Sequence, residues 1–314
     1  MSSPSVIRKP KALRKGSTLA SFAPASPPPD FASAQLGMTE LQRLGFEVVP
    51  AHEFLPSGYF AGSAAERLEG FRNALQNNRI AGLIALRGGY GSTYLLDFLA
   101  QDKLDHPKCL IGYSDITALQ TFLWQKHGWI TFHGPMLAAG FDHGSNGLRG
   151  FEENSFLNAV TSAAPWSVQL SGEVLVPGQA EGRILGGCLA ILQTSLGTPW
   201  EIDTDDALLL IEDTHVKPYQ VDRALMHLKQ AGKLANVRGI VLGEFPSSAP
   251  PVPQSPTVRE VCERILAPLR IPIVFAAAIG HTHRPMLTIP LGIRARIRAE
   301  GEGVLEFLEP AVIE

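Results

Sequence analysis

The chain has 314 residues, of which 45% are hydrophobic and 18% charged. This length and composition exclude a globally disordered protein and favour two domains, each able to bury a core. Lysine and arginine number 27 against 30 acidic residues, for a formal net charge of −3. A nucleic-acid-binding protein normally shows a clustered basic excess, so that class is not expected.

The N-terminus and the cysteines indicate where the protein works. The first 20 residues contain no apolar stretch typical of a secretory signal, and no apolar run is long enough to predict a membrane span. The three cysteines, Cys109, Cys188 and Cys262, are too few and odd in number for a disulfide framework. We therefore expect a cytoplasmic protein with free thiols and no membrane partner.

In the first half of the chain, short apolar segments typical of strands alternate with amphipathic segments of helical length. The expected strands are Thr18–Phe22, Phe46–Pro50, Ile80–Leu86, Lys108–Gly112 and Trp129–Phe132. The expected helices are Met38–Leu44, Ala64–Gln76, Ser92–Leu99 and Asp115–His127. This alternation predicts an α/β fold with a largely parallel sheet, built by residues 1–150 as an N-terminal domain.

The pattern weakens after about residue 138, and residues 151–180 are expected to be a crossover between domains with two short strands. Residues 181–314 are expected to form a smaller C-terminal α/β domain. Its predicted strands are Ala207–Ile211, Arg238–Leu242 and Pro272–Ala277, and its predicted helices are Cys188–Gln193, Val221–Gln230 and Thr257–Ala267. The last stretch, Leu287–Glu309, alternates as antiparallel strands do.

The most informative local feature is Gly112-Tyr113-Ser114-Asp115, between a predicted buried strand and a predicted helix. A sharp strand-to-helix turn lifts the hydroxyl of its central residue above the sheet and directs the next backbone N–H toward an oxyanion. The second glycine usual in such a hydrolase turn is absent, and Ile116 stands in its place. Taken alone, Ser114 fits an N-cap as well as a nucleophile.

A second turn, Arg87-Gly88-Gly89-Tyr90-Gly91, also follows a predicted strand and precedes a predicted helix. Its three glycines let the backbone approach a ligand closely and expose N–H groups. The spacing does not match a dinucleotide fingerprint, and no P-loop lysine follows, so a nucleotide site is weakly supported. Beside Ser114, this loop could instead help to stabilise an oxyanion.

A nucleophilic serine needs a base and a group that orients the base. His281 follows a predicted strand and precedes a proline-containing turn. Glu212 ends a different apolar strand, Leu208–Ile211. A carboxylate at the end of a buried strand is costly unless it has a partner. Each residue alone is equally compatible with a structural role.

A metal site is the alternative chemistry for the same region. His281 and His283, together with Asp213 and His215, resemble zinc ligands in spacing. Nine histidines make such a spacing common by chance, and no His-Glu-x-x-His or Cys-x-x-Cys motif accompanies it. We therefore expect neither a metal nor another cofactor.

With these motifs identified, the sequence resembles the LD-carboxypeptidase family, serine peptidases that include muramoyltetrapeptide carboxypeptidases and microcin-C self-immunity proteins. The resemblance covers nearly the whole chain. It is carried by Arg87-Gly88-Gly89-Tyr90-Gly91, Gly112-Tyr113-Ser114-Asp115-Ile116-Thr117, His133-Gly134-Pro135, Gly186-Gly187 with Leu189, Gly197-Thr198-Pro199, Leu210-Ile211-Glu212-Asp213, and Gly280-His281 with Ile289–Gly292.

The resemblance implies a Ser-Glu-His triad: Ser114 as nucleophile, Glu212 as orienting carboxylate and His281 as general base and acid. It further implies an oxyanion hole from the backbone of Asp115 and Gly89. The N-terminal domain would be flavodoxin-like or glutaminase-like, with the active site between the two domains of a homodimer. The implied reaction is release of the terminal D-alanine from cytoplasmic murein tetrapeptides.

An exopeptidase must also bind a free carboxylate, and Arg87 and Arg284 are the candidates. Two features depart from the family pattern: Cys188 stands where asparagine often follows Gly-Gly, and residues 245–256 are unusually rich in proline and serine.

Alternatives within the fold remain. One is a self-immunity hydrolase that cleaves peptidyl or acyl-adenylate amides, which would need a base-stacking aromatic residue such as Trp166 or Trp200, since Trp129 fits a strand core. Another is a non-catalytic muropeptide- or sugar-binding module, in which Ser114 would be dispensable. The glutaminase-like relatives use cysteine at the turn, which the serine at position 114 disfavours.

Overall fold

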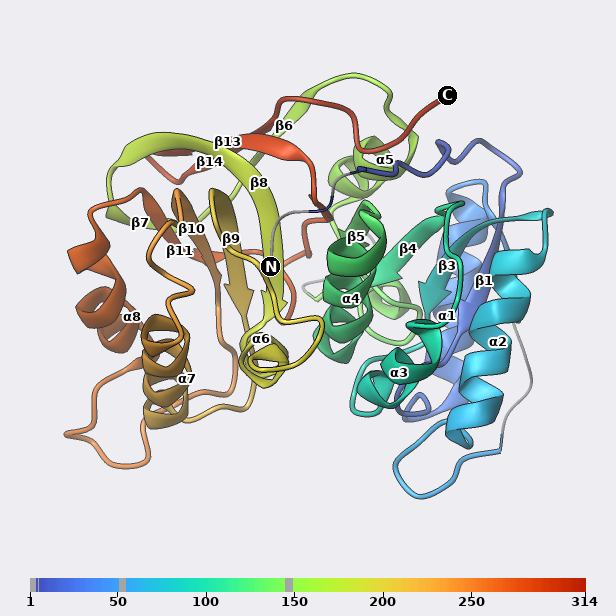
Figure 1. Cartoon of the computed structure of the whole chain (residues 1–314), viewed down its shortest axis with the longest axis horizontal. Coiled ribbons are helices and arrows are strands. Elements are labelled where there is room, and N and C mark those ends of the chain that lie inside the picture. Colours follow the sequence, from blue (N-terminus) through green and yellow to red (C-terminus); the bar gives the residue numbers. More distant parts are fainter. Residues whose placement is uncertain (1–3, 5, 51–54, 145–148) are drawn as a thin grey trace.

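Two β-sheets stand side by side in the computed structural model, which describes residues 4, 6–50, 55–144 and 149–314 (Figure 1). The first sheet contains six strands in the order β12-β5-β4-β3-β1-β2. Its strands are β1 (Thr18–Phe22), β2 (Glu47–Pro50), β3 (Ile80–Ala85), β4 (Cys109–Gly112), β5 (Thr131–His133) and β12 (Ile289–Leu291). All pairs are parallel except β12 with β5.

The second sheet contains eight strands in the order β6-β14-β13-β8-β9-β10-β11-β7. Its centre, β8 to β11, is parallel, and antiparallel strands flank it on both sides. The strands are β6 (Trp166–Gln169), β7 (Glu173–Val176), β8 (Gly178–Cys188), β9 (Ala207–Glu212), β10 (Gly239–Gly243), β11 (Ile273–Ala277), β13 (Arg294–Ala299) and β14 (Val304–Phe307). The mixed α/β fold expected from the sequence is confirmed.

Helices connect and cover the sheets, and several begin at side-chain caps that the sequence provides. Asp30, Ser63 and Thr257 each accept a hydrogen bond from a first-turn backbone N–H. The α-helices are α1 (Phe31–Arg43), α2 (Ala64–Gln76), α3 (Leu96–Leu99), α4 (Thr117–His127), α5 (Glu153–Thr161), α6 (Leu189–Ser195), α7 (Pro218–Gln230) and α8 (Val258–Leu266). Short 3₁₀ turns are η1 (Ser92–Leu95), η2 (Ser114–Ile116), η3 (Phe141–His143) and η4 (Ala267–Leu269). In the described part of the chain, no helix is both long and apolar enough to cross a bilayer.

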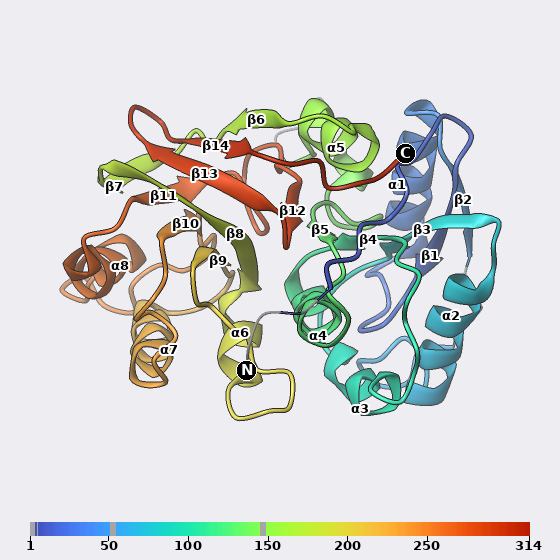
Figure 2. The same cartoon turned by 45° about the horizontal axis from the view of Figure 1, so that its top comes forward.

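Several elements differ from the sequence expectation, including helix α5, which lies within residues 151–180, where only two short strands were expected. Helix α1 begins at Phe31 rather than Met38, because the Asp30 cap starts it directly after the proline-rich turn. No strand was expected over most of β8, because its glycines weaken any strand pattern, yet its partners β9 and β13 hold it in the middle of the sheet. Figure 2 shows β12 beside β5, so the chain returns to the first sheet near its C-terminal end.

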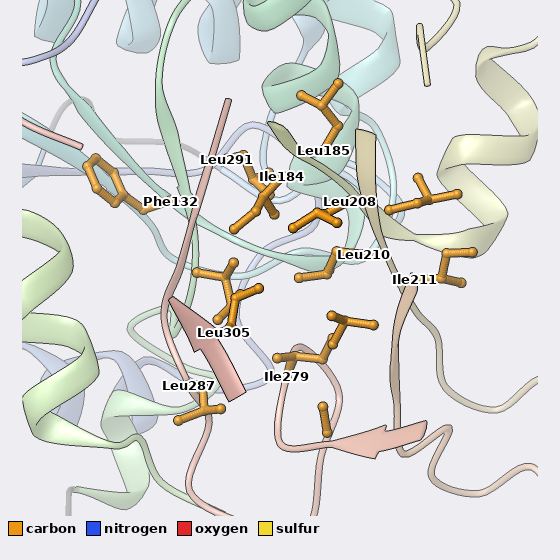
Figure 3. Close-up of a cluster of buried hydrophobic side chains, with 14 of the residues drawn as sticks. Phe132, Ile184, Leu185, Leu208, Leu210, Ile211, Ile279, Leu287, Leu291 and Leu305 are labelled. Carbon is orange, nitrogen blue, oxygen red and sulfur yellow. The ribbon is translucent and has the colours of Figure 1, made fainter. Parts of the chain in front are cut away.

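The two sheets meet along a seam, formed by α4 on one side and by β8 and α6 on the other. Buried hydrophobic side chains continue across this region, as Figure 3 shows for Phe132 of β5, Leu291 of β12 and Leu185 of β8. The packing is close at Gly187, where φ is +142° and a Cβ atom would lie 2.5 Å from Thr117 Oγ1. The domain limits at residues 150 and 180 stay a prediction.

This close approach predicts a large cost for Gly187→Ala. The substitution combines an unfavourable φ with a clash against α4, and we expect it to lower the free energy of unfolding by about 2–6 kcal/mol. Gly197→Ala is the matched control, because Gly197 also has a positive φ of +78° but open space around its Cβ position. It should cost only about 1–2 kcal/mol. Urea unfolding measures both, and equal losses would contradict a tightly packed seam.

Candidate active site

Ser114 lies in a strained turn at the carboxyl end of β4. Its φ is +63°, in the left-handed region that residues with a Cβ atom rarely occupy. Gly112 permits the turn, because a Cβ atom there would lie 2.9 Å from the Ile116 side chain. The serine is half-buried, and the 3₁₀ turn that it begins continues into α4. The strand-to-helix turn expected around Ser114 is therefore present.

The glycine loop expected to flank Ser114 lies directly against it. A Cβ atom at Gly88 would be 2.8 Å from Ser114 Cβ and 2.9 Å from its Oγ, so only glycine fits. The carboxylate of buried Asp115 ties the loop to the turn by accepting a 2.8 Å hydrogen bond from the backbone N–H of Ser92. Asp115 also stands at the start of a helical segment, where backbone N–H groups lack helical partners. The glycine loop and the start of the helical turn thus both lie next to Ser114.

Glu212 ends β9, an inner strand whose residues are all buried. Its side chain is fully buried and fills space that two glycines leave open. A Cβ atom at Gly243 would lie 2.7 Å from Glu212 Cβ, and one at Gly280 would lie 2.3 Å from its carboxyl carbon. The Glu212 side chain is therefore enclosed by backbone at both its Cβ atom and its carboxylate.

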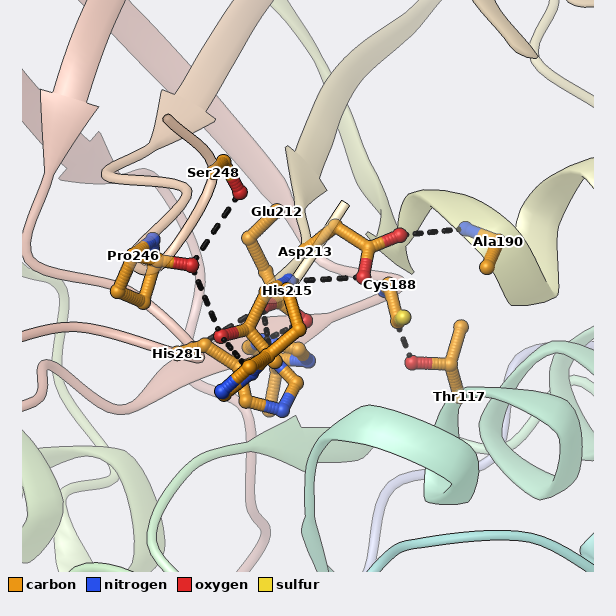
Figure 4. Close-up of polar contacts among 11 residues, drawn as sticks. Thr117, Cys188, Ala190, Glu212, Asp213, His215, Pro246, Ser248 and His281 are labelled. Atoms are coloured by element: carbon orange, nitrogen blue, oxygen red, sulfur yellow. Dashed lines mark hydrogen bonds and ion pairs between the residues drawn. The ribbon is translucent and has the colours of Figure 1, made fainter. Parts of the chain in front are cut away.

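His281 is the main partner of this buried charge. Glu212 Oε2 accepts hydrogen bonds from His281 Nδ1 at 2.6 Å and from the His281 backbone N–H at 2.9 Å (Figure 4). Burial alone lowers the pKa of His281, but the Glu212 carboxylate more than offsets it and leaves the pKa above its ordinary value of 6.5. Burial likewise favours a raised pKa for Glu212, yet His281 holds that pKa below its ordinary value. The pair therefore favours a carboxylate beside an imidazolium.

Tyr113 links this pair to the serine turn. Its ring lies edge-on to the His281 ring, with 4.9 Å between the centroids, and Ser114 is the next residue. Among the described residues, no hydrogen bond joins Ser114 to His281. Hydrogen bonds of this kind are often long in a free enzyme and shorten when substrate binds. The three residues thus gather at the seam from β4, β9 and the loop after β11.

The two candidate arginines have different surroundings. Arg87 precedes the glycine loop and donates only to the Pro27 carbonyl, at 3.1 Å, with no carboxylate partner among the described residues. Arg284 pairs with Glu244 and also donates to the carbonyls of Ser171 and Ala276. The guanidinium of Arg284 is therefore engaged within the fold, whereas Arg87 retains free donors.

The four residues that suggested a zinc site each have other hydrogen-bond partners. Asp213 accepts hydrogen bonds from the backbone of Ala190 and Thr214, and His215 contacts the Thr214 hydroxyl. The backbone N–H of His283 donates to Glu244, and the His281 ring is hydrogen-bonded to Glu212. Within the described ranges, no three His, Cys, Asp or Glu side chains are grouped so that they could hold a metal ion.

The two departures from the family pattern also contact this region. Cys188 is buried and its backbone N–H donates to Thr117 Oγ1 at 3.1 Å across the seam, while burial raises the pKa of its thiol. In the proline- and serine-rich loop, the Pro246 carbonyl accepts hydrogen bonds from the His215 backbone and the Thr214 hydroxyl. Figure 4 shows this loop beside the segment that follows Glu212.

Two side chains that contact the Glu212–His281 pair were not among the site residues predicted from the sequence. Tyr113 was noted only as part of the serine motif, although its ring packs on His281. His133 was noted only within His133-Gly134-Pro135, although its Nε2 lies 3.7 Å from Glu212 Oε1. Their place at the carboxyl ends of β4 and β5, where sites of parallel sheets gather, is the signal that could have identified them.

Two comparisons with sequences agree on the family. Residues 19–134 match the LD-carboxypeptidase N-terminal domain, and residues 181–297 match its C-terminal domain. The chain is similar to the "Probable murein peptide carboxypeptidase" of Bacillus subtilis, with 36% identity over 95% of this chain and 94% of that protein. It is also similar to the microcin C7 self-immunity protein MccF of Escherichia coli, with 29% identity over 93% of each chain.

Solved structures give the same result. A muramoyltetrapeptide carboxypeptidase from Oxalobacter formigenes is similar with a TM-score of 0.82 and 30% identity, covering 93% of this chain and 99% of that one. MccF in complex with aspartyl sulfamoyl adenosine is similar with a TM-score of 0.87 and 25% identity, covering 98% of this chain and all of that one. With two matched domains and relatives that span nearly its whole length, the chain belongs to the LD-carboxypeptidase family and is a serine carboxypeptidase.

Proposed function

We propose that this protein releases the terminal D-alanine from murein tetrapeptides, with Ser114 as nucleophile, His281 as general base and acid, and Glu212 as the orienting carboxylate. The observation that carries the proposal is the buried Glu212–His281 hydrogen bond beside the strained Ser114 turn. The similarity to proteins named for murein peptides and muramoyltetrapeptides supports the substrate class.

The reaction uses each group in turn. His281 Nε2 takes the Ser114 proton as Oγ attacks the carbonyl between the L-centre of diaminopimelate or lysine and D-alanine. Glu212 stabilises the imidazolium that forms, because it accepts from Nδ1. The imidazolium then protonates the departing amine of D-alanine. Water, deprotonated by His281, hydrolyses the acyl-enzyme and restores the serine.

The tetrahedral oxyanion needs donors that already point at it. In this proposal they are the backbone N–H groups of Asp115, which follows Ser114, and of Gly89, whose neighbour Gly88 lies against Ser114. Asp115 precedes α4, and Gly89 has a φ of +99° beside Ser26. Each such donor is typically worth about 3–4 kcal/mol of the barrier.

The runner-up function is hydrolysis of peptidyl or acyl-adenylate amides, supported by the similarity to MccF. Its expected base-stacking tryptophans are half-buried and already pack on other aromatic rings. Trp166 lies against Phe307 with 4.2 Å between ring centroids, and Trp200 packs on Phe122. Trp129 is buried and donates to the Leu104 carbonyl. These contacts favour the murein substrate.

The cellular setting is part of the same proposal. The buried free thiols Cys109, Cys188 and Cys262 suit a reducing cytoplasm, where cell-wall peptides would be recycled. A homodimer is expected from the family resemblance. Light scattering of the purified protein tests the dimer, and fractionation of cells that express it tests the location.

Ser114→Ala is the first test of the function. The native protein should release D-alanine from an anhydromuramoyl tetrapeptide, and the variant should lose at least about 10³-fold in kcat. Ser247→Ala is the control, because Ser247 is an exposed serine that also has a positive φ of +58°. Release by neither protein, with hydrolysis of an aminoacyl sulfamoyl adenosine instead, would favour the runner-up function. Equal release by the native protein and Ser114→Ala would exclude Ser114 as nucleophile.

Glu212→Gln tests the carboxylate through the pH profile. His281 accepts a proton only when neutral, so kcat/KM of the native protein should fall as the pH drops through its raised pKa, above 6.5. In the variant the charge that raises this pKa is gone, so the acidic limb should move to lower pH. The plateau should fall by about 10⁴-fold, because the amide no longer orients the imidazole. Glu181→Gln, a change far from His281, should leave the profile unchanged.

Arg87→Gln tests recognition of the terminal carboxylate. A charge-assisted hydrogen bond is worth about 1.5–3 kcal/mol, so the variant should raise KM by about 10- to 100-fold. Amidation of the terminal D-alanine should weaken native binding by a similar factor and have little further effect on the variant. Arg284→Gln should reduce thermal stability rather than carboxylate selectivity, because its guanidinium holds three groups of the fold. If the increases in KM caused by Arg87→Gln and by amidation were fully additive, this role for Arg87 would be contradicted.

A further inference from the structure

His133 is a buried titratable residue to which the mechanism above gives no role. It is the last residue of β5 and pairs with Gly112 of β4, two residues before the serine. On its other side it pairs with Ile289 of β12. Its side chain is fully buried, yet it belongs to the sheet that carries Ser114 while it faces Glu212 of the second sheet.

Three polar atoms at this contact have no hydrogen-bond partner among the described residues. They are both ring nitrogens of His133 and Oε1 of Glu212. The Nε2 and Oε1 atoms are 3.7 Å apart, slightly beyond hydrogen-bond length. A buried polar atom without a hydrogen-bond partner is costly. A hydrogen bond between His133 Nε2 and Glu212 Oε1 would satisfy both atoms.

The two oxygens of Glu212 have unequal partners. Oε2 accepts both hydrogen bonds from His281, whereas Oε1 accepts none. The charged and titratable groups around His133 are Glu212 and His281, with Tyr113 edge-on at 6.1 Å between ring centroids. Burial lowers the pKa of His133 to about 4, so its ring is neutral where the enzyme works and has a single N–H to donate.

We propose that His133 is a positioning residue that donates from Nε2–H to Oε1 of Glu212 and so holds the carboxylate in line with His281. This inference rests on the proposed roles of Glu212 and His281. The donor comes from the sheet of the nucleophile and the acceptor from the other sheet. The contact therefore fixes the base relative to the serine, although His133 touches neither the substrate nor Ser114.

The tautomer of His133 in the native protein is the first test, because it needs neither a variant nor activity. Long-range ¹H–¹⁵N correlation spectra of ¹⁵N-histidine-labelled protein distinguish a protonated Nε2 from a protonated Nδ1. We expect His133 to carry its proton on Nε2 from pH 5 to 8 without titrating. A proton on Nδ1 would direct a lone pair at the carboxylate and would overturn the proposal.

Two variants then test the effect on catalysis. The amide nitrogen of glutamine reaches roughly where Nε2 lies, whereas that of asparagine does not. His133→Asn should lower kcat about 10- to 100-fold with KM nearly unchanged, and His133→Gln should stay within about threefold of native kcat. Without the donor, the charge of Glu212 acts undiminished on His281. The acidic limb of kcat/KM should therefore move to higher pH in His133→Asn by about half to one unit.

A purely structural role gives a different result. Both variants would then lose thermal stability alike and keep the native kcat and acidic limb once folded, and that outcome would overturn the proposal. If neither variant folds, the tautomer of His133 in the native protein still tests the proposal, because a proton on Nδ1 would overturn it. Failure of the proposed function is seen separately, because it appears either as no D-alanine release by the native protein or as release that survives Ser114→Ala.

Discussion

The buried negative charge of Glu212 is the constraint on which the site depends. A carboxylate without solvent is costly unless hydrogen bonds and an opposite charge stabilise it, and His281 supplies both. The same pairing fixes the imidazole ring and raises its affinity for a proton, which are the two properties that the proposed general base needs. Gly243 and Gly280 leave the space in which the pair forms. Both the packing at the seam and the proposed mechanism therefore require that the Glu212 carboxylate stay buried, ionised and immobile.

Close backbone approach also fixes the surroundings of Ser114, the proposed nucleophile. Gly88 lets the glycine loop touch Ser114, and Gly187 lets β8 approach Thr117 at the start of α4. Each contact is possible only without a Cβ atom, so the seam tolerates little displacement. Rigidity of this kind suits acyl transfer, because a misplaced base or oxyanion donor weakens catalysis steeply. The strain at Ser114, whose φ is +63°, is retained because the surrounding packing determines it.

The similarities reach both a probable murein peptide carboxypeptidase and the self-immunity protein MccF. Catalytic groups stand at strand ends, which the sheets hold firmly. Substrate selection depends on arginine and loop side chains around them, which vary more easily on a shared fold. Arg87, with free donors beside the glycine loop, is the residue proposed to bind the terminal carboxylate. Arg284, enclosed by Glu244 and two carbonyls, belongs to the framework.

The sequence by itself determined the local elements and the likeness to the family, because hydrophobic periodicity and turn glycines act over a few residues. It predicted β1, β3 and β4, and it identified Ser114, Glu212 and His281 as the residues to examine. Only the tertiary structure decided which groups meet. Strand β8, rich in glycine, gains its place from its neighbours β9 and β13, and β12 joins a sheet formed mainly by residues far earlier in the chain. The contact of His133 with Glu212 joins residues 79 positions apart on different sheets (212 − 133). No local pattern encodes such a contact, because it depends on how the two sheets pack.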